Sequence, residues 1–341
     1  MGGCRDGFLN RLTSVGRRRF APKIRGLKLN GIKRRSFLTA AGLGLGLLSQ
    51  GKWSKAYADD NKPRSIANSV VVKRGYTECR FGQLHYIRAV PATGVTSGPP
   101  LVLLHQNPSS SVEYEALLKV MGTDREVVAF DTPGNGMSDF PPEPLDIAGY
   151  AAAFGDGMEG LSLGVREPVD VFGYHTGTFL GAELAIAQGD KVGRLVMSGI
   201  PFRTPEERQQ RLDDIAAGPK LTEDGEQILG NLRRLWDFVV ANRDPRVSLE
   251  RGAQLFMEKG KPMHRYWWPY NGVWTYEVKE RFPLISQPVL ILQPHETLLE
   301  NAKQAAAYIA DVKIVELPDL DRDVFDVGSP TIGRALREFL T

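Results

Sequence analysis

A series of short apolar runs, separated by longer segments of helical pattern, constrains the fold of this chain most. Each run is continuous rather than alternating, as expected of a strand that is buried on both faces of a parallel sheet. Two alternating segments, residues 69–73 and 83–89, come first and predict a β-hairpin. The sequence therefore predicts an α/β fold class with a mostly parallel, doubly wound sheet. The continuous runs are residues 101–104, 126–130, 169–172, 195–197, 289–292 and 313–317.

One long segment, residues 201–283, interrupts this alternation after the sixth strand. It is rich in charged residues, has a helical pattern and ends in a cluster of aromatic residues. Ligands of such sheets bind outside the carboxyl ends of the strands, so a helical cap inserted there would cover the site. We therefore predict a cap between two parts of one body, residues 59–200 and 284–341, with Trp267 and Trp268 as substrate contacts.

The first 58 residues hold 13 Lys or Arg residues against the single Asp6. The pair Arg34-Arg35 is followed by a mild apolar run that ends near Leu48 and by Ala-Tyr-Ala at residues 56–58. These three parts in this order predict a twin-arginine signal peptide, residues 1–58. The apolar run is shorter than the roughly 20 residues that span a bilayer. We expect a periplasmic or secreted protein with no stable membrane anchor after cleavage.

The remaining chain is acidic, with 30 basic and 39 acidic residues. Such a body has no broad basic face for phosphates, so nucleic acid is not an expected partner. Cys79 would be its single cysteine, which excludes an internal disulfide. We expect a small-molecule substrate and no cofactor.

Residues 173–177, Gly-Tyr-His-Thr-Gly, follow the strand at 169–172 and precede a helical pattern at 178–188. This strand-turn-helix context is the one that the G-x-nucleophile-x-G elbow requires. The sharp turn strains the backbone of the middle residue, and small flanking residues let neighbouring chains pass close by. The pattern predicts that His175 projects from the floor of a pocket, where a hydrolase would carry Ser, Cys or Asp.

Two further segments follow the third and fourth strands: residues 104–108, Leu-His-Gln-Asn-Pro, and residues 130–139, Phe-Asp-Thr-Pro-Gly-Asn-Gly-Met-Ser-Asp. They resemble the HGxP oxyanion loop and the D-x-P-G-x-G-x-S segment of the α/β-hydrolase superfamily, in its capped branch with haloalkane dehalogenases and epoxide hydrolases. The resemblance covers roughly residues 69–341. It implies the α/β-hydrolase fold and an oxyanion hole formed by the N–H groups of Asn107 and Thr176.

The same resemblance implies a nucleophile at the elbow, an acid after the seventh strand and a histidine after the last. Here the elbow holds His175, and Glu296, or its neighbour Thr297, stands at the acid position. The histidine position holds Arg322, which stays charged and cannot act as a general base. Ser-His-Asp chemistry is therefore excluded, as is the dehalogenase reaction, which needs an elbow aspartate.

Three hypotheses remain. In the first, His175, oriented by Glu296 and with Arg322 as a third catalytic candidate, is a general acid/base for a small, largely apolar substrate. Hydroxynitrile lyases and cofactor-free oxygenases of this superfamily imply that the pocket supports proton transfer. In the second, the chain is a degenerate hydrolase that only binds a ligand. In the third, His105, His175 and His295 form a metal site of a metal-dependent hydrolase.

Two of these residues also have plainer interpretations. His105 is a candidate substrate-binding residue, yet a histidine in such a loop more often makes a structural hydrogen bond. Arg322 would form an ion pair with Asp321, Asp323 or Glu296.

Overall fold

The computed structural model describes residues 69–216, 218 and 221–341. Its strands are β1 (Val70–Cys79), β2 (Gly82–Pro91), β3 (Leu101–Leu104), β4 (Val127–Phe130), β5 (Val169–Tyr174), β6 (Val192–Ser198), β7 (Val289–Pro294) and β8 (Val312–Leu317). They form one sheet in the order β1-β2-β4-β3-β5-β6-β7-β8. β2 is antiparallel to β1 and to β4, and every other neighbouring pair is parallel. The predicted α/β class with a mostly parallel sheet is confirmed.

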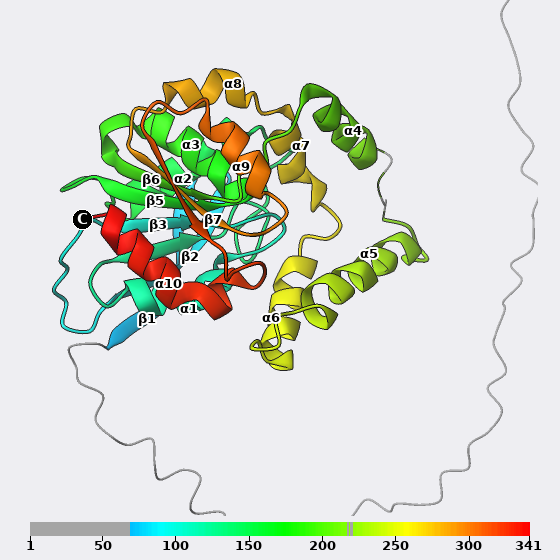
Figure 1. The fold of residues 1–341 in the computed structure, drawn as a ribbon. Coiled ribbons are helices and arrows are strands. Elements are labelled where there is room, and N and C mark those ends of the chain that lie inside the picture. Colours follow the sequence, from blue (N-terminus) through cyan, green and yellow to red (C-terminus); the bar gives the residue numbers. More distant parts are fainter. Residues whose placement is uncertain (1–68, 217, 219–220) are drawn as a thin grey trace, which may run out of the picture. The chain divides into compact units, whose positions relative to one another are not determined.

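Helices cover both faces of the sheet, which explains why the strand sequences are continuously apolar (Figure 1). On β5, Val171 packs in one core cluster and its neighbour Phe172 in the other, because successive side chains of a strand point to opposite faces. One cluster contains residues of α2 (Ile147–Gly160), α3 (Thr176–Gln188) and α9 (Leu299–Ala306). The other contains residues of α1 (Glu115–Met121) and α10 (Val324–Phe339). Short helical turns η2 (Ser111–Tyr114) and η3 (Gly189–Lys191) complete this body.

Between β6 and β7 the chain leaves the body as a helical segment, residues 199–288, which we call the inserted segment. Its helices are α4 (Pro205–Ala216), α5 (Glu226–Trp236), α6 (Leu249–Gly260), α7 (Trp267–Thr275) and α8 (Val278–Arg281), with the short turns η4 (Asp237–Ala241) and η5 (Phe282–Leu284). A small core of Val239, Val240 and Leu255 joins η4 to α6. No described residue of α4 or α5 is buried.

The predicted signal peptide, residues 1–58, lies outside the described residues. Among the residues that are described, no helix combines the length and the apolar character needed to cross a membrane.

Candidate active site

The turn between β5 and α3 places His175 at the carboxyl edge of the sheet. Its backbone has φ 49° and ψ −113°, in the left-handed region that an L-residue rarely adopts, at a cost of about 1–3 kcal/mol. Gly173 and Gly177 make the turn possible, since a Cβ at Gly173 would overlap the backbone of Gly177, and one at Gly177 would overlap the carbonyl of Leu104. The strain at His175 is therefore held by close packing of three neighbouring backbone segments.

His175 and Glu296 form a hydrogen-bonded pair. Nε2 of His175 lies 2.8 Å from each carboxylate oxygen of Glu296. An ionised carboxylate only accepts hydrogen bonds, so this geometry assigns the proton to Nε2 and the role of donor to the ring. Nδ1 has no hydrogen-bond partner among the described residues and is the acceptor nitrogen of the neutral ring. The pair therefore presents a basic nitrogen at its free edge.

Two neighbours fix the position of the His175 ring. The Tyr174 ring stacks on it, with centroids 4.0 Å apart and an interplanar angle of 28°. Gly199, directly after β6, has φ 69°, and a Cβ there would overlap both the His175 ring and the Glu296 carboxylate. The glycine thus leaves the space that the histidine–carboxylate pair fills.

Asn107 and Thr176, predicted to supply two backbone N–H groups, line one cavity together with His175. Thr176 is the first residue of α3, where N–H groups have no acceptor within the helix. Neither N–H donates to a protein group in the part of the chain that the structure describes. The inserted segment contacts Asn107 of the body through two hydrogen bonds. Nδ2 of Asn107 donates to the Tyr266 carbonyl at 2.7 Å, and the Asn107 carbonyl accepts from the Tyr270 hydroxyl. Both N–H groups are available to an oxygen atom bound beside His175.

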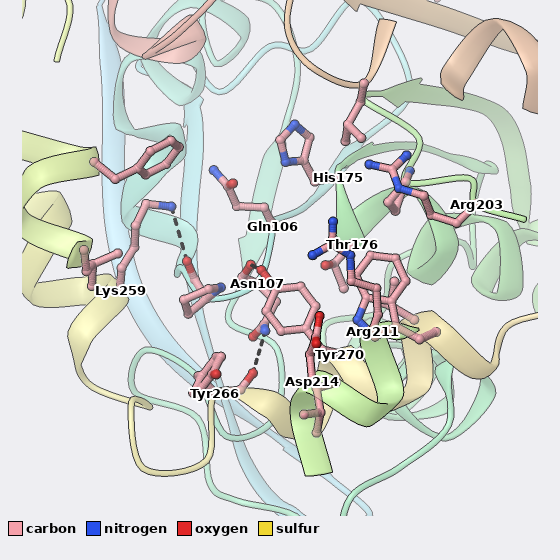
Figure 2. Close-up of a pocket in the computed structure, with 18 residues that line it drawn as sticks. Gln106, Asn107, His175, Thr176, Arg203, Arg211, Asp214, Lys259, Tyr266 and Tyr270 are labelled. Carbon is pink, nitrogen blue, oxygen red and sulfur yellow. Dashed lines mark hydrogen bonds between the residues drawn. The ribbon is translucent and has the colours of Figure 1, made fainter. Parts of the chain in front are cut away.

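Two cavities meet at His175. The first cavity, of about 500 Å³, lies between the β5–α3 turn and the inserted segment (Figure 2). The second cavity, of about 630 Å³, extends toward the loop between β8 and α10. Both volumes are in the range of small-molecule sites, roughly 300–1,000 Å³. The residues common to both are Gln106, His175, Phe238 and Lys259.

Helix α7 supplies the aromatic wall of the first cavity, but not with the residues predicted from the sequence. Neither Trp267 nor Trp268 lines it, and Trp268 packs instead against Phe140 and under the Arg265 guanidinium. The structure therefore places the predicted substrate contacts Trp267 and Trp268 outside the lining of this cavity. A helix exposes positions i, i+4, i+7 and i+8 on one face, and the two tryptophans fall on another. The residues from this part of the chain that line the cavity are Tyr266, Tyr270, Val273 and Trp274.

Lys259 of α6 anchors the inserted segment beside the site. Its Nζ donates to the Pro108 carbonyl at 3.2 Å and lies 3.8 Å from a carboxylate oxygen of Glu113 (Figure 2 draws the first contact). Burial of the Lys259 ammonium lowers its pKa. Glu113 also accepts hydrogen bonds from the backbone and the side chain of Gln106. No sequence motif indicates Lys259, because its partners are about 150 residues away along the chain.

Comparisons with known proteins agree with this architecture. A family model described as alpha/beta hydrolase fold matches residues 99–261. A haloalkane dehalogenase from Mycolicibacterium paratuberculosis is 28% identical over 212 residues, 56% of this chain and 68% of that protein. A hydrolase structure from Pseudomonas aeruginosa has a TM-score of 0.62 at 18% identity, covering 79% of this chain and 98% of the other. The chain has the alpha/beta hydrolase fold.

A third similar protein, a cis-3-alkyl-4-alkyloxetan-2-one decarboxylase from Shewanella oneidensis, is 29% identical over 130 residues. These residues are 37% of this chain and 38% of the decarboxylase. The region shared with it is therefore a minor part of either protein.

Of the two candidates for the acid position, Glu296 contacts His175, whereas the neighbouring Thr297 is exposed. Arg322 stands where the superfamily has its histidine, and its partners are Asp321 and Asn242 rather than His175 or Glu296. The side chain of Arg322 is 52% exposed, lies 3.7 Å from Asp321 and donates to the carbonyl of Asn242. Arg322 lines the second cavity but contacts neither His175 nor Glu296, so the structure supports its interpretation as an ion-pair residue.

The three histidines predicted to bind a metal do not converge. Nε2 of the buried His105 accepts from the Thr132 N–H at 2.9 Å, and its Nδ1 donates to the Gln106 carbonyl. His295 bonds to Glu316 at 2.6 Å on the surface. His105 and His295 are thus engaged away from His175, and within the described residues no group of three metal-ligating side chains exists. The prediction of a metal site formed by His105, His175 and His295 is therefore wrong. His105 is a structural residue that lines neither cavity.

Proposed function

We propose that this protein is an enzyme that transfers protons without a covalent intermediate, with His175 as the general base. The observation that carries this proposal is the contact of His175 Nε2 with both oxygens of Glu296, which leaves Nδ1 toward the cavities. The carboxylate fixes the ring orientation and stabilises the imidazolium that forms when Nδ1 takes a proton. The substrate is a small carbonyl compound with a largely apolar body, bound under the inserted segment, which acts as a cap.

The reaction that fits this arrangement is removal of a proton from the carbon beside the carbonyl. The C–H bond breaks, the proton moves to Nδ1 of His175, and the electron pair moves through the carbon onto the carbonyl oxygen. The N–H groups of Asn107 and Thr176 then stabilise the negative charge on that oxygen. The imidazolium returns the proton in a later step, so His175 serves as base and as acid.

The absence of a histidine at the superfamily's third position supports non-covalent chemistry. Arg322 cannot accept a proton from a nucleophile, and no hydroxyl lies at the centre of the turn. The site therefore lacks the proton acceptor that serine-ester formation requires, while it retains a base and an oxyanion hole.

The test is exchange of carbon-bound hydrogen for deuterium in D₂O, followed by NMR over a panel of small aldehydes, ketones and their acids. His175→Ala should reduce the exchange rate about 10²- to 10⁴-fold, the contribution usual for a general base. Glu296→Gln should cause a smaller loss, because the amide still holds the ring but does not stabilise the imidazolium.

His295→Ala is the matched control, since His295 also follows β7 but pairs with Glu316 on the surface. Its exchange rate should equal that of the wild type. Undiminished exchange by His175→Ala, or a substrate adduct on His175 seen by mass spectrometry, would overturn the proposal. Ligand binding without exchange on any compound would support a binding protein instead.

We further propose that residues 1–58 direct export through the twin-arginine route and that the mature protein acts in the periplasm or outside the cell. The basic lead, the arginine pair and the small residues at 56–58 support this. N-terminal sequencing of the protein from a periplasmic fraction should begin at Asp59. Retention of the full chain in the cytoplasm would contradict the proposal.

A further inference from the structure

Two arginines of the inserted segment, Arg203 and Arg211, line the first cavity together with His175 and Thr176. Figure 2 shows both guanidinium groups pointing into the cavity. Arg203 donates a hydrogen bond to the carbonyl of Phe202, and among the described residues neither arginine forms an ion pair with a carboxylate. Arg208, on the same helix as Arg211, is instead paired with Glu277 at 2.8 Å.

The two guanidinium groups repel each other. Burial lowers the pKa of Arg203, the nearby Glu207 carboxylate raises it, and the Arg211 charge lowers it by a smaller amount. Bringing two cations to one partly buried cavity is unfavourable unless an anion lies between them. A negatively charged ligand group between the two guanidinium groups would therefore lower this electrostatic cost.

The side chains that line the first cavity carry more positive than negative charge, since Arg203, Arg211 and Lys259 line it together with a single acidic residue, Asp214. Two further carboxylates lie outside the lining: Glu113 is 3.8 Å from Lys259, and Glu207 is close enough to Arg203 to raise its pKa. A ligand group with a single negative charge, such as a carboxylate, would be repelled less by Asp214 than a dianionic phosphate group.

We propose that the ligand of the first cavity is a carboxylate-bearing molecule with an apolar body, its carboxylate held between Arg203 and Arg211. Guanidinium groups bind carboxylates through paired, charge-assisted hydrogen bonds. The apolar body packs against the wall formed by Tyr270, Val273 and Trp274 and by Leu298. The claim that His175 acts on this molecule rests on the proposed function. The claim that the cavity binds the carboxylate does not rest on it.

The test is equilibrium binding to the full chain, by calorimetry, of phenylacetate, of its neutral analogue phenylacetamide and of the dianionic benzylphosphonate. Phenylacetate should bind most tightly, with a Kd below about 1 mM, and its affinity should fall as salt is added. Arg203→Gln and Arg211→Gln should each weaken its binding about tenfold, and neither should affect phenylacetamide. Arg208→Gln is the matched control and should leave phenylacetate binding unchanged.

Equal affinity for phenylacetamide, tighter binding of benzylphosphonate, no binding of phenylacetate by the wild type, or wild-type affinity in both arginine variants would overturn this inference. His175→Ala should still bind phenylacetate, which separates the inference from the proposed function. Carboxylate binding without proton exchange would leave this inference standing and remove the enzymatic proposal. Proton exchange at an unchanged rate in Arg203→Gln and Arg211→Gln would remove this inference and leave the enzymatic proposal standing.

Discussion

The body and the inserted segment contribute different groups to the site and are built differently. In the body, β3, β4, β5 and β7 are buried along their whole length. In the inserted segment, η4 and α6 share a separate core of three buried residues, and the described residues of α4 and α5 are all at least partly exposed. Val273, Tyr276 and Phe282 of the same segment belong instead to the core of the body. His175, Glu296 and the backbone N–H groups of Asn107 and Thr176 come from the body, whereas Arg203 and Arg211 come from the segment.

This difference separates chemistry from ligand selection. The strained turn at His175 and its 2.8 Å hydrogen bond to Glu296 lie where neighbouring backbones pack most closely. The arginines that we propose to hold the carboxylate lie where packing is light, so they can change with little effect on the fold. The following predictions test that separation, beginning with the largest expected effect.

Core truncation should distinguish the two regions most clearly. Phe172 of β5 is 1% exposed and packs edge-on against the rings of Tyr114 and Phe325, so Phe172→Ala should cost about 3–5 kcal/mol of the free energy of unfolding. Leu255→Ala, in the small core of the inserted segment, should cost about 2 kcal/mol, since a lightly packed site collapses more easily. Urea denaturation measures both, and equal losses would show that the segment is packed as firmly as the body.

The body should also carry a pH dependence of stability. Burial of the Asp170 carboxyl, 3.7 Å from Arg125, raises its pKa from 3.8 to about 6. A carboxyl with a raised folded-state pKa binds its proton more tightly when folded, so its contribution to stability is lost as pH rises from about 4 to 6. Relative to Asp170→Asn, the wild type should lose about 3 kcal/mol over that range.

The measurement for Asp170 is the free energy of unfolding of both proteins at a series of pH values. Asp213→Asn, on an exposed position of α4, is the control from the inserted segment and should show no such trend. A constant difference between wild type and Asp170→Asn would contradict the prediction.

Gly199→Ala should affect the site more than the fold. Its positive φ adds about 1–3 kcal/mol of strain, and the new Cβ displaces the His175 ring or the Glu296 carboxylate. We expect the proton exchange of the proposed reaction to fall to the level of His175→Ala, while phenylacetate still binds. Gly225→Ala is the matched control, because Gly225 also has a positive φ, but a Cβ there would meet only the Leu229 side chain. Retained exchange in Gly199→Ala would show that the pair tolerates displacement.

The strands were predictable because the signal is local. A run such as residues 101–104 is apolar at every position only when both faces of the strand are covered, and few other structures require that pattern. The sequence of residues 173–177 predicted the turn at His175 for the same reason, since its glycines allow close approach of neighbouring backbone.

The aromatic wall was predictable in principle from helical periodicity. Counting from Tyr266 in steps of four and three residues leads to Tyr270 and Val273, whereas residue size alone pointed to Trp267 and Trp268. Arg211 could be found in the same way, since Arg211, Asp214 and Ile215 share one face of α4.

By itself, the sequence determined the α/β sheet, the turn at His175 and the lack of a histidine at the third position of the triad. These depend on which residues are present and on their local periodicity. The tertiary structure alone decided that Glu296 pairs with His175 while its neighbour His295 pairs with Glu316, and that His105 serves its own loop. Which groups lie within 3 Å of a ring nitrogen depends on how distant strands and loops are placed. That placement is set by packing of the whole body and not by any short stretch of sequence.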